Sequence, residues 1–302
     1  MAAATATLVR GASPRLATGH LLFLAVASLL LLLFSPRAAA QPWQVCGNTG
    51  NYTAKSPYQS NLESLAKALP ANASRSGNLF AAGSVGAVPD VVYALALCRG
   101  DTNATACGSC VATGFQDAQQ LCAYDRDAAV FYDACYLRFS NQNFIASTTN
   151  NGDTIILMNS QKVSSPVRAF DAAVAVLLNA TGDHAAGNAS RFGTGEEGFD
   201  ARSDPTIYGL TQCTPDMSSA DCRSCLGSII SAMPQYLSGR QGGRIVGMRC
   251  NFRYEVYSFF SEAPSLRLPA LAPPPAPSPV PFNVTPTATP PGEMSATDSP
   301  SF

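Results

Sequence analysis

Histidine is scarce in this sequence: only two occur in 302 residues, and one of them, His20, lies in the N-terminal leader described below. Histidine is the usual base that activates a serine or cysteine nucleophile, and it is the commonest metal ligand. The other, His184, lies between two glycosylation motifs, so we expect it in a solvated loop. No phosphate-loop or paired-carboxylate motif appears elsewhere. The sequence therefore predicts a protein that is not an enzyme and that needs no metal or cofactor.

Runs of basic residues are also missing. The chain has 19 Lys and Arg against 20 Asp and Glu. Three of the basic residues (Arg10, Arg15 and Arg37) belong to the leader, which leaves 16 against 20, or a net charge of −4, in the remaining chain. A mildly acidic chain without a basic patch has no electrostatic footprint for DNA or RNA, so nucleic acid is excluded as a partner.

Long apolar runs are absent apart from Leu21–Phe34. This run of 14 residues is shorter than the roughly 18–20 that a membrane-spanning helix needs. It follows two arginines and precedes the small residues Ala38–Ala40, which is the order of a signal peptide and its cleavage site. We expect residues 1–40 to be removed, and the mature chain to be secreted to the apoplast without a membrane span.

Cysteine, in contrast, is well represented, and all ten cysteines follow the leader. An even number in an exported chain predicts disulfides. The alternative is zinc, because Cys107 and Cys110, and likewise Cys222 and Cys225, have metal-ligand spacing. With one histidine in the mature chain and an oxidising export route, disulfides are favoured.

An internal repeat determines the domain organisation. Several positions recur at a constant offset of 115 residues: Cys98 as Cys213, Cys107 as Cys222, Cys110 as Cys225, Cys135 as Cys250, and Arg138 as Arg253. Such a pattern indicates a tandem duplication. We predict a signal peptide at 1–40, a first copy at 41–147, a linker at 148–153, a second copy at 154–262 and a proline-rich disordered tail at 263–302. Residues 264–302 hold 12 of the 22 prolines, which leaves little to form a core.

Two cysteines of the first copy have no counterpart in the second. Cys122 corresponds to Leu237, and Cys46 corresponds to a stretch near residues 158–161 that contains no cysteine. If both copies share one connectivity, the two missing cysteines should be partners, which predicts Cys46–Cys122. The remaining four of the first copy can pair in three ways, and the residues do not choose among them.

Each copy shows the pattern of an α+β domain. Helical spacing predicts a helix over Pro57–Leu69 capped by Ser56, and a counterpart over Pro166–Leu178 capped by Ser165. A second helix should begin near Cys107 in the first copy. The corresponding helix of the second copy should begin near Cys222, with Asp221 as its N-cap.

Strand signals follow the second helix of each copy. Arg244–Phe260 and its counterpart Ala128–Ser140 alternate between apolar and polar residues, which is typical of an antiparallel strand with one solvated face. Helices on one face of an antiparallel sheet are the natural arrangement for these elements. Six N-glycosylation motifs, which we expect on surface loops, begin at Asn51, Asn72, Asn103, Asn179, Asn188 and Asn283.

The spacing Cys98-x8-Cys107-x2-Cys110, repeated at Cys213, Cys222 and Cys225, resembles the ginkbilobin-homologous domain of land plants, also called the salt-stress-response/antifungal domain. Tandem copies behind a signal peptide resemble the cysteine-rich receptor-like secreted proteins. The resemblance implies two helices on a five-stranded antiparallel sheet in each copy. It also implies the disulfides Cys46–Cys122, Cys98–Cys107, Cys110–Cys135, Cys213–Cys222 and Cys225–Cys250.

Some members of this family are antifungal proteins that bind mannose through an Asn, an Arg and a Glu. The matching positions in the first copy are Gly47, Ala129 and Ser140, so the resemblance implies that this copy has lost the site. In the second copy they are Asn159, Arg244 and Glu255, which keep the residue types.

The sequence thus predicts a secreted binding protein for mannose-type glycans with a role in antifungal or stress defence. The alternative hypothesis is a protein-interaction module that acts as a decoy or co-ligand for the ectodomains of related receptor-like kinases.

Overall fold

The computed structural model describes residues 42–151, 154–164, 166–200 and 204–269. The predicted signal peptide, the cap Ser165, the motif at Asn283 and most of the proline-rich tail lie outside the described residues.

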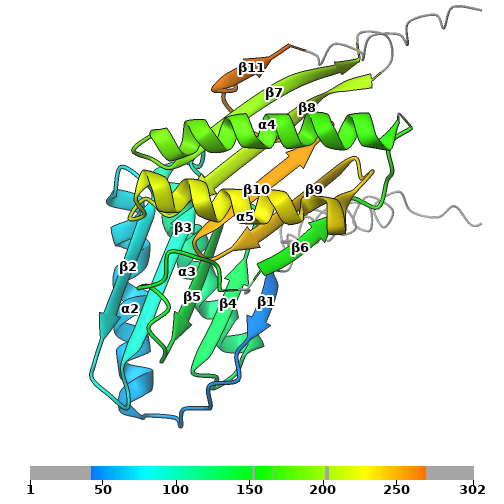
Figure 1. The fold of residues 1–302 in the computed structure, drawn as a ribbon. Coiled ribbons are helices and arrows are strands. Elements are labelled where there is room, and N and C mark those ends of the chain that lie inside the picture. Colours follow the sequence, from blue (N-terminus) through cyan, green and yellow to red (C-terminus); the bar gives the residue numbers. More distant parts are fainter. Residues whose placement is uncertain (1–41, 152–153, 165, 201–203, 270–302) are drawn as a thin grey trace, which may run out of the picture.

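The first copy is an α+β unit, as predicted. Its elements are β1 (Trp43–Cys46), α2 (Pro57–Arg75), β2 (Phe80–Val85), β3 (Val92–Cys98), α3 (Ala104–Leu121), β4 (Asp127–Phe131) and β5 (Cys135–Ser140). The five strands form one antiparallel sheet in the order β1-β4-β5-β3-β2. Helices α2 and α3 cover one face of this sheet (Figure 1). Ser56 caps α2 as expected, since its side chain accepts a hydrogen bond from the amide of Gln59.

The second copy repeats this architecture. Its elements are β6 (Thr154–Met158), α4 (Val167–Gly187), β7 (Phe192–Asp200), β8 (Asp204–Cys213), α5 (Ser219–Leu237), β9 (Gly242–Gly247), β10 (Cys250–Glu255) and β11 (Leu266–Leu268). Five antiparallel strands and the parallel strand β11 form a sheet in the order β11-β7-β8-β10-β9-β6. The fold class predicted from the sequence is confirmed, with one strand more than expected in this copy.

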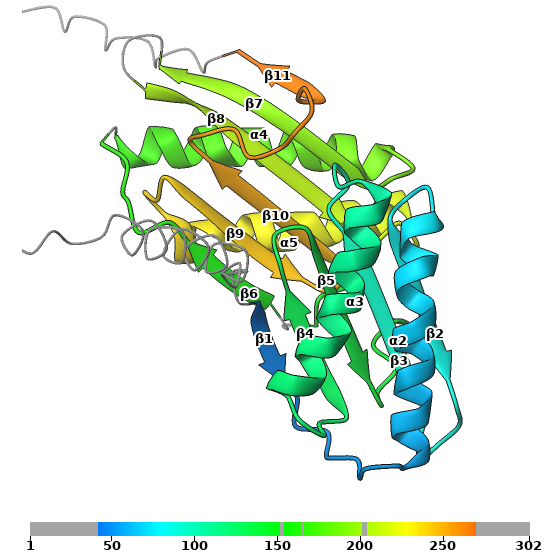
Figure 2. The same ribbon diagram turned by 180° about the vertical axis from the view of Figure 1, so that it is seen from behind.

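Strand β11 corrects the predicted start of the proline-rich tail. Leu266–Leu268 lies inside the region predicted to be disordered, and it pairs with β7 as the edge strand of the sheet (Figures 1 and 2). The amide of Ser265 donates to Oγ1 of Thr194 at 3.1 Å, and Arg267 forms an ion pair with Glu196. The short sequence Leu-Arg-Leu alternates as a strand does, and this signal was hidden by the prolines on either side.

Each long alternating segment predicted as one strand is a hairpin of two strands. Arg244–Phe260 contains most of β9 and all of β10, and Ala128–Ser140 contains most of β4 and all of β5. A tight turn preserves the alternation, so the pattern does not reveal the reversal. In the second copy the linker residue Asn150 stabilises this turn, because its Oδ1 accepts from the amides of Arg249 and Cys250.

Three local predictions on helices were also wrong. The N-cap of α5 is Ser218 rather than Asp221: Ser218 accepts from the amide of Asp221 and donates back to its carboxylate. His184 lies in the last turn of α4, not in a loop. Of the glycosylation motifs expected on loops, Asn72 and Asn179 lie within α2 and α4.

The two copies pack through the sheet faces that carry no helices. Helices α4 and α5 lie toward the viewer in Figure 1 while α2 and α3 lie behind, and the reverse is seen in Figure 2. A shared apolar cluster joins the sheets. It contains Leu95, Leu97, Ala129, Phe131, Tyr136 and Phe144 of the first copy and Ile155, Val246 and Met248 of the second. The hydroxyl of Tyr136 donates to the carbonyl of Met248 at 3.3 Å, so polar contacts reinforce this interface.

Candidate functional site

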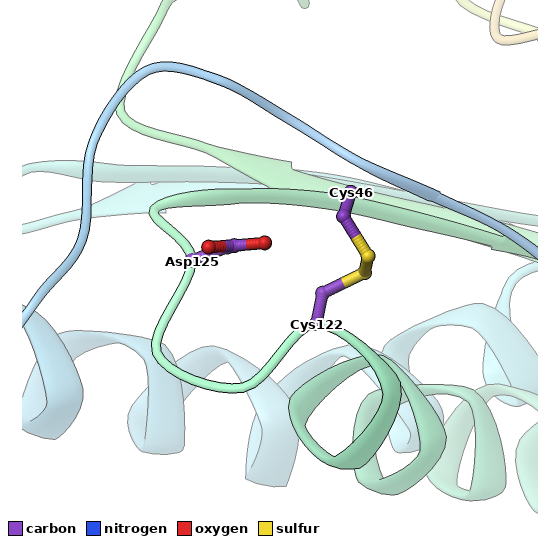
Figure 3. Close-up of side chains that lie close together, drawn as sticks. All are labelled: Cys46, Cys122 and Asp125. Carbon is purple, nitrogen blue, oxygen red and sulfur yellow. A yellow bond between two sulfur atoms is a disulfide. The ribbon is translucent and has the colours of Figure 1, made fainter.

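The five disulfides fix the elements around the candidate sites. They join Cys46–Cys122, Cys98–Cys107, Cys110–Cys135, Cys213–Cys222 and Cys225–Cys250, which are the pairs that the family resemblance implies. The two members of each Cys-x-x-Cys pair belong to different disulfides, so these pairs do not act as zinc ligands. Figure 3 shows the carboxylate of Asp125 close to the Cys46–Cys122 bridge. The two sulfurs are bonded to each other and are not available as metal ligands. Of these three residues, only Asp125 offers a ligand atom to a cation.

The structure brings the three predicted sugar-binding residues of the second copy to one side of its sheet. Asn159 follows β6, Arg244 lies on β9 and Glu255 ends β10. Gly242 connects two of them, since its carbonyl accepts from the amide of Asn159 at 2.9 Å and it is the cross-strand partner of Glu255. The residues are therefore neighbours in the fold, as the resemblance implies.

Arg244, however, is engaged by the first copy. Its Nη1 donates to Oδ1 of Asp133 at 3.0 Å, and its guanidinium lies 5.6 Å from the centroid of the Trp43 ring. Only 17% of its side chain is exposed. Burial lowers the pKa of Arg244, and the nearby positive charge of Arg253 lowers it further.

The other two members of the predicted trio also bond within the protein. Oε1 of Glu255 accepts from Arg253 at 3.1 Å, whereas Oε2 is buried without a hydrogen-bond partner. Oδ1 of Asn159 accepts from the amide of Gln161 at 2.9 Å. A sugar at this position must therefore compete with contacts that the folded chain already makes.

Asp133 holds the two copies together at this point. Its carboxylate contacts Arg99 of its own copy and Arg244 and Arg253 of the second copy, at 2.8, 3.0 and 2.9 Å. Burial alone would raise the pKa of Asp133, but the three guanidinium groups outweigh it and lower that pKa. The first copy thus covers Arg244, one of the three residues of the predicted site in the second copy.

The equivalent face of the first copy contains a cleft. This cleft of about 520 Å³, which we call the first-copy cleft, lies against β1 and β4 and reaches the second copy. It is lined by Val45, Cys46, Gly47, Asn48, Thr49, Asp127, Ala129, Phe131, Arg138 and Gln142 of the first copy, and by Thr154, Ile155 and Met248 of the second. Its volume is in the range of small-ligand sites.

Two of the first-copy positions at which the family's sugar-binding residue types are absent, Gly47 and Ala129, line this cleft. The missing groups are supplied by their neighbours. Asn48 follows Gly47 and provides an amide. Arg138, the cross-strand partner of Ala129, provides a guanidinium, and Asp127, the cross-strand partner of Ser140, provides a carboxylate.

Asp127 and Arg138 position each other. Nε of Arg138 donates to Oδ1 of Asp127 at 2.9 Å and Nη2 to Oδ2 at 2.7 Å, in the forked geometry typical of strong pairs. A Cβ atom at residue 47 would lie 2.5 Å from Cβ of Asp127, so an Asn does not fit there. The sequence analysis missed Asp127 and Arg138 because it matched the family's binding residues position by position. Recognising the β4–β5 hairpin would have indicated them, because the hairpin places residue 127 opposite residue 140 and residue 129 opposite residue 138.

Within the described part of the chain, no helix combines the length and apolar character required to cross a bilayer.

Comparisons with known proteins agree with the fold. A family model described as salt stress response/antifungal matches residues 45–142 and 158–257. The cysteine-rich receptor-like protein kinase 6 of Oryza sativa subsp. japonica is 50% identical over 253 residues, which are 80% of this chain but 36% of that kinase. The antimicrobial ginkbilobin-2-like protein of Castanea crenata is 37% identical over 235 residues, covering 77% of this chain and 95% of that protein.

A solved structure has the same fold. The tandem DUF26 ectodomain of the Arabidopsis thaliana cysteine-rich receptor-like protein PDLP8 matches with a TM-score of 0.57 and 21% sequence identity. The match covers 70% of this chain and 96% of that ectodomain. At this level of identity the match shows the fold alone.

Proposed function

Because the chain belongs to the salt stress response/antifungal family, we propose that it is a non-catalytic, extracellular glycan-binding protein whose first-copy cleft binds mannose-type glycans. The observation that carries the proposal is the presence of an amide, a guanidinium and a carboxylate in one cleft, from Asn48, Arg138 and Asp127. A carboxylate accepts hydrogen bonds from vicinal hydroxyls, a guanidinium donates, and an amide does both.

The second-copy trio of Asn159, Arg244 and Glu255 is the weaker candidate for the same activity. Asp127 and Glu255 are equally buried, but binding at the second-copy trio also requires Arg244 to leave Asp133 of the first copy. In the first-copy cleft, by contrast, Asn48 and Gln142 are exposed and need no rearrangement to meet a ligand.

Affinity for a single sugar should be low. A single sugar held by a few hydrogen bonds has a Kd on the order of millimolar, equivalent to about −4 kcal/mol. Useful retention on a cell wall then requires a clustered glycan that engages several copies of the protein.

The proposed setting is defence in the apoplast. The Castanea crenata relative is named an antimicrobial protein, and five disulfides suit an oxidising extracellular compartment. Binding to exposed mannose chains of a microbial surface would connect the first-copy cleft to that role.

The proposal is tested by titrating the protein with mannose oligosaccharides. The variant Asn48→Ala/Gln142→Ala removes two exposed amides from the first-copy cleft and should abolish measurable binding. Asn78→Ala/Gln120→Ala removes two exposed amides elsewhere and should bind as wild type does. If wild type does not bind any mannose oligosaccharide, the proposed function fails.

A second function is favoured by the edge strand β1, in which all four residues are exposed, including Trp43 and Val45. An unpaired strand edge with apolar side chains is suited to protein contacts. In this alternative the chain associates with the ectodomain of a related receptor-like kinase, such as the rice kinase that shares half of its aligned residues. Interferometry with that immobilised ectodomain tests it, and Trp43→Ser should weaken the association.

A further inference from the structure

The first-copy cleft changes character along strand β4. Asp127, Ala129 and Phe131 alternate along this strand and all three line the cleft. At about 3.4 Å per residue, Asp127 and Phe131 are about 14 Å apart. The cleft therefore begins at a carboxylate and ends at an aromatic ring.

The end near Asp127 is polar. Asn48 and Thr49 border it from the segment after β1, and Gln142 borders it from the segment after β5. Together with Asp127 and Arg138 these side chains provide both donors and acceptors, which suits a ligand part that carries hydroxyl groups.

The opposite end is apolar and is completed by the second copy. Phe131, Ile155 and Met248 line it, and all three belong to the apolar cluster that joins the two sheets. Val45 adds an exposed apolar side chain on the β1 side. A part of the interdomain cluster is thus accessible from the cleft, where an apolar ligand part would remove it from water.

We propose that the ligand of this cleft is amphipathic: a sugar joined to a short apolar group, such as an alkyl or aryl glycoside, rather than a free sugar. This inference rests on the proposed function. The sugar occupies the polar end beside Asp127 and Arg138, and the apolar group lies against Ile155 and Met248. Because residues of the second copy form the apolar end, only the tandem of two copies provides the whole site.

The test compares two probes on the full mature protein, methyl α-mannoside and octyl α-mannoside, below the concentration at which the latter forms micelles. Octyl α-mannoside should bind at least about tenfold more tightly, because two buried methylene groups already account for that factor. Val45→Thr/Ile155→Thr makes the apolar end polar; it keeps the side-chain shape at residue 45 and shortens the side chain at residue 155 by one carbon. This variant should lose most of the octyl advantage and retain the affinity for methyl α-mannoside.

Two further variants separate the outcomes. Val176→Thr changes an exposed valine on α4, away from the cleft, and should keep the octyl advantage. Asn48→Ala/Gln142→Ala should lose both probes. Equal affinities of wild type for the two probes, or an octyl advantage that survives in Val45→Thr/Ile155→Thr, would overturn the inference while glycan binding stands. If neither probe binds to wild type, both the inference and the proposed function fail.

Discussion

The carboxylate of Glu255 occupies the space that a side chain at residue 242 would need: a Cβ atom on Gly242 would overlap with Oε2 of Glu255. The first copy has the opposite arrangement. With the offset of 115 residues, Asp127 corresponds to Gly242 and Ser140 to Glu255, and these positions are cross-strand partners in both copies. The carboxylate therefore stands on one strand in the first copy and on the neighbouring strand in the second. In each copy it pairs with the equivalent arginine, Arg138 or Arg253.

Gly242→Ala should destabilise the protein by about 1–3 kcal/mol, because the methyl group and the Glu255 carboxylate cannot share the same space. Gly242→Asp/Glu255→Ser recreates the first-copy arrangement and should recover most of the loss. Denaturant unfolding measures both. Gly77→Ala is the control, since a Cβ atom there meets no atom within 4 Å. If the double variant is no more stable than Gly242→Ala, the carboxylate cannot be moved from residue 255 to residue 242, which contradicts the proposed equivalence of the two arrangements.

Glu197 predicts a pH dependence of stability. It is fully buried on β7, neither of its carboxylate oxygens has a hydrogen-bond partner, and burial raises its pKa from 4.5 to about 7. The folded state thus binds this proton more tightly than the unfolded state. The resulting stability is fully present below pH 4.5 and is lost as the pH rises through 7, by about 3 kcal/mol in total.

Chemical unfolding between pH 4 and pH 8 tests this prediction. Glu197→Gln should remove that part of the pH dependence, whereas Glu262→Gln, at an exposed carboxylate, should behave as wild type does. Parallel stability curves of wild type and Glu197→Gln over this range would show that Glu197 does not titrate as described.

Asp133→Asn should weaken the contact between the copies, because it removes the charge shared by Arg99, Arg244 and Arg253. With 55% of the Asp133 side chain exposed, solvent screening limits the loss to about 1 kcal/mol, and added salt should reduce it further. The pKa of Asp133 is lowered on folding, so its contribution is present above the ordinary value of 3.8 and disappears as the pH falls through the lower, folded value. Asp125→Asn, away from the interface, is the control. An Asp133→Asn variant as stable as wild type at low salt would rule out this role.

Two truncations separate strand β11 from the tail that follows it. Ending the chain after residue 262 removes Leu266–Leu268 and the ion pair of Arg267 with Glu196, so the melting temperature should fall. Ending it after Pro269 keeps this strand, and the proline content of the removed part predicts no change in melting temperature. Equal melting temperatures of the two truncated chains would mean that β11 adds nothing to stability.

Patterns local to one segment were predicted well from the sequence. The 115-residue repeat identified the two copies, and the cap at Ser56 placed the start of α2. Prediction failed where the outcome depends on contacts between distant segments. The turn at Arg249 is stabilised by Asn150, and the position of Arg244 is determined by Asp133 of the other copy. Nothing in the sequence near these residues indicates their partners.

Contacts between distant segments also explain why the candidate site lies in the first copy rather than in the second. The second copy keeps the residue types expected for sugar binding, yet the packing of the two copies covers Arg244. The first copy lacks those residue types, yet cross-strand neighbours of the expected positions provide equivalent groups. Which copy remains open follows from the packing of the two sheets, and a single-copy comparison contains no information on that packing.

The most direct test of the account is a crystal structure of the mature protein soaked with a mannose trisaccharide. The account predicts sugar density in the first-copy cleft, within hydrogen-bond distance of Asn48, Asp127 or Arg138, while Arg244 still contacts Asp133. Sugar density on Arg244 and Glu255 in the second copy, with the first-copy cleft empty, would contradict it.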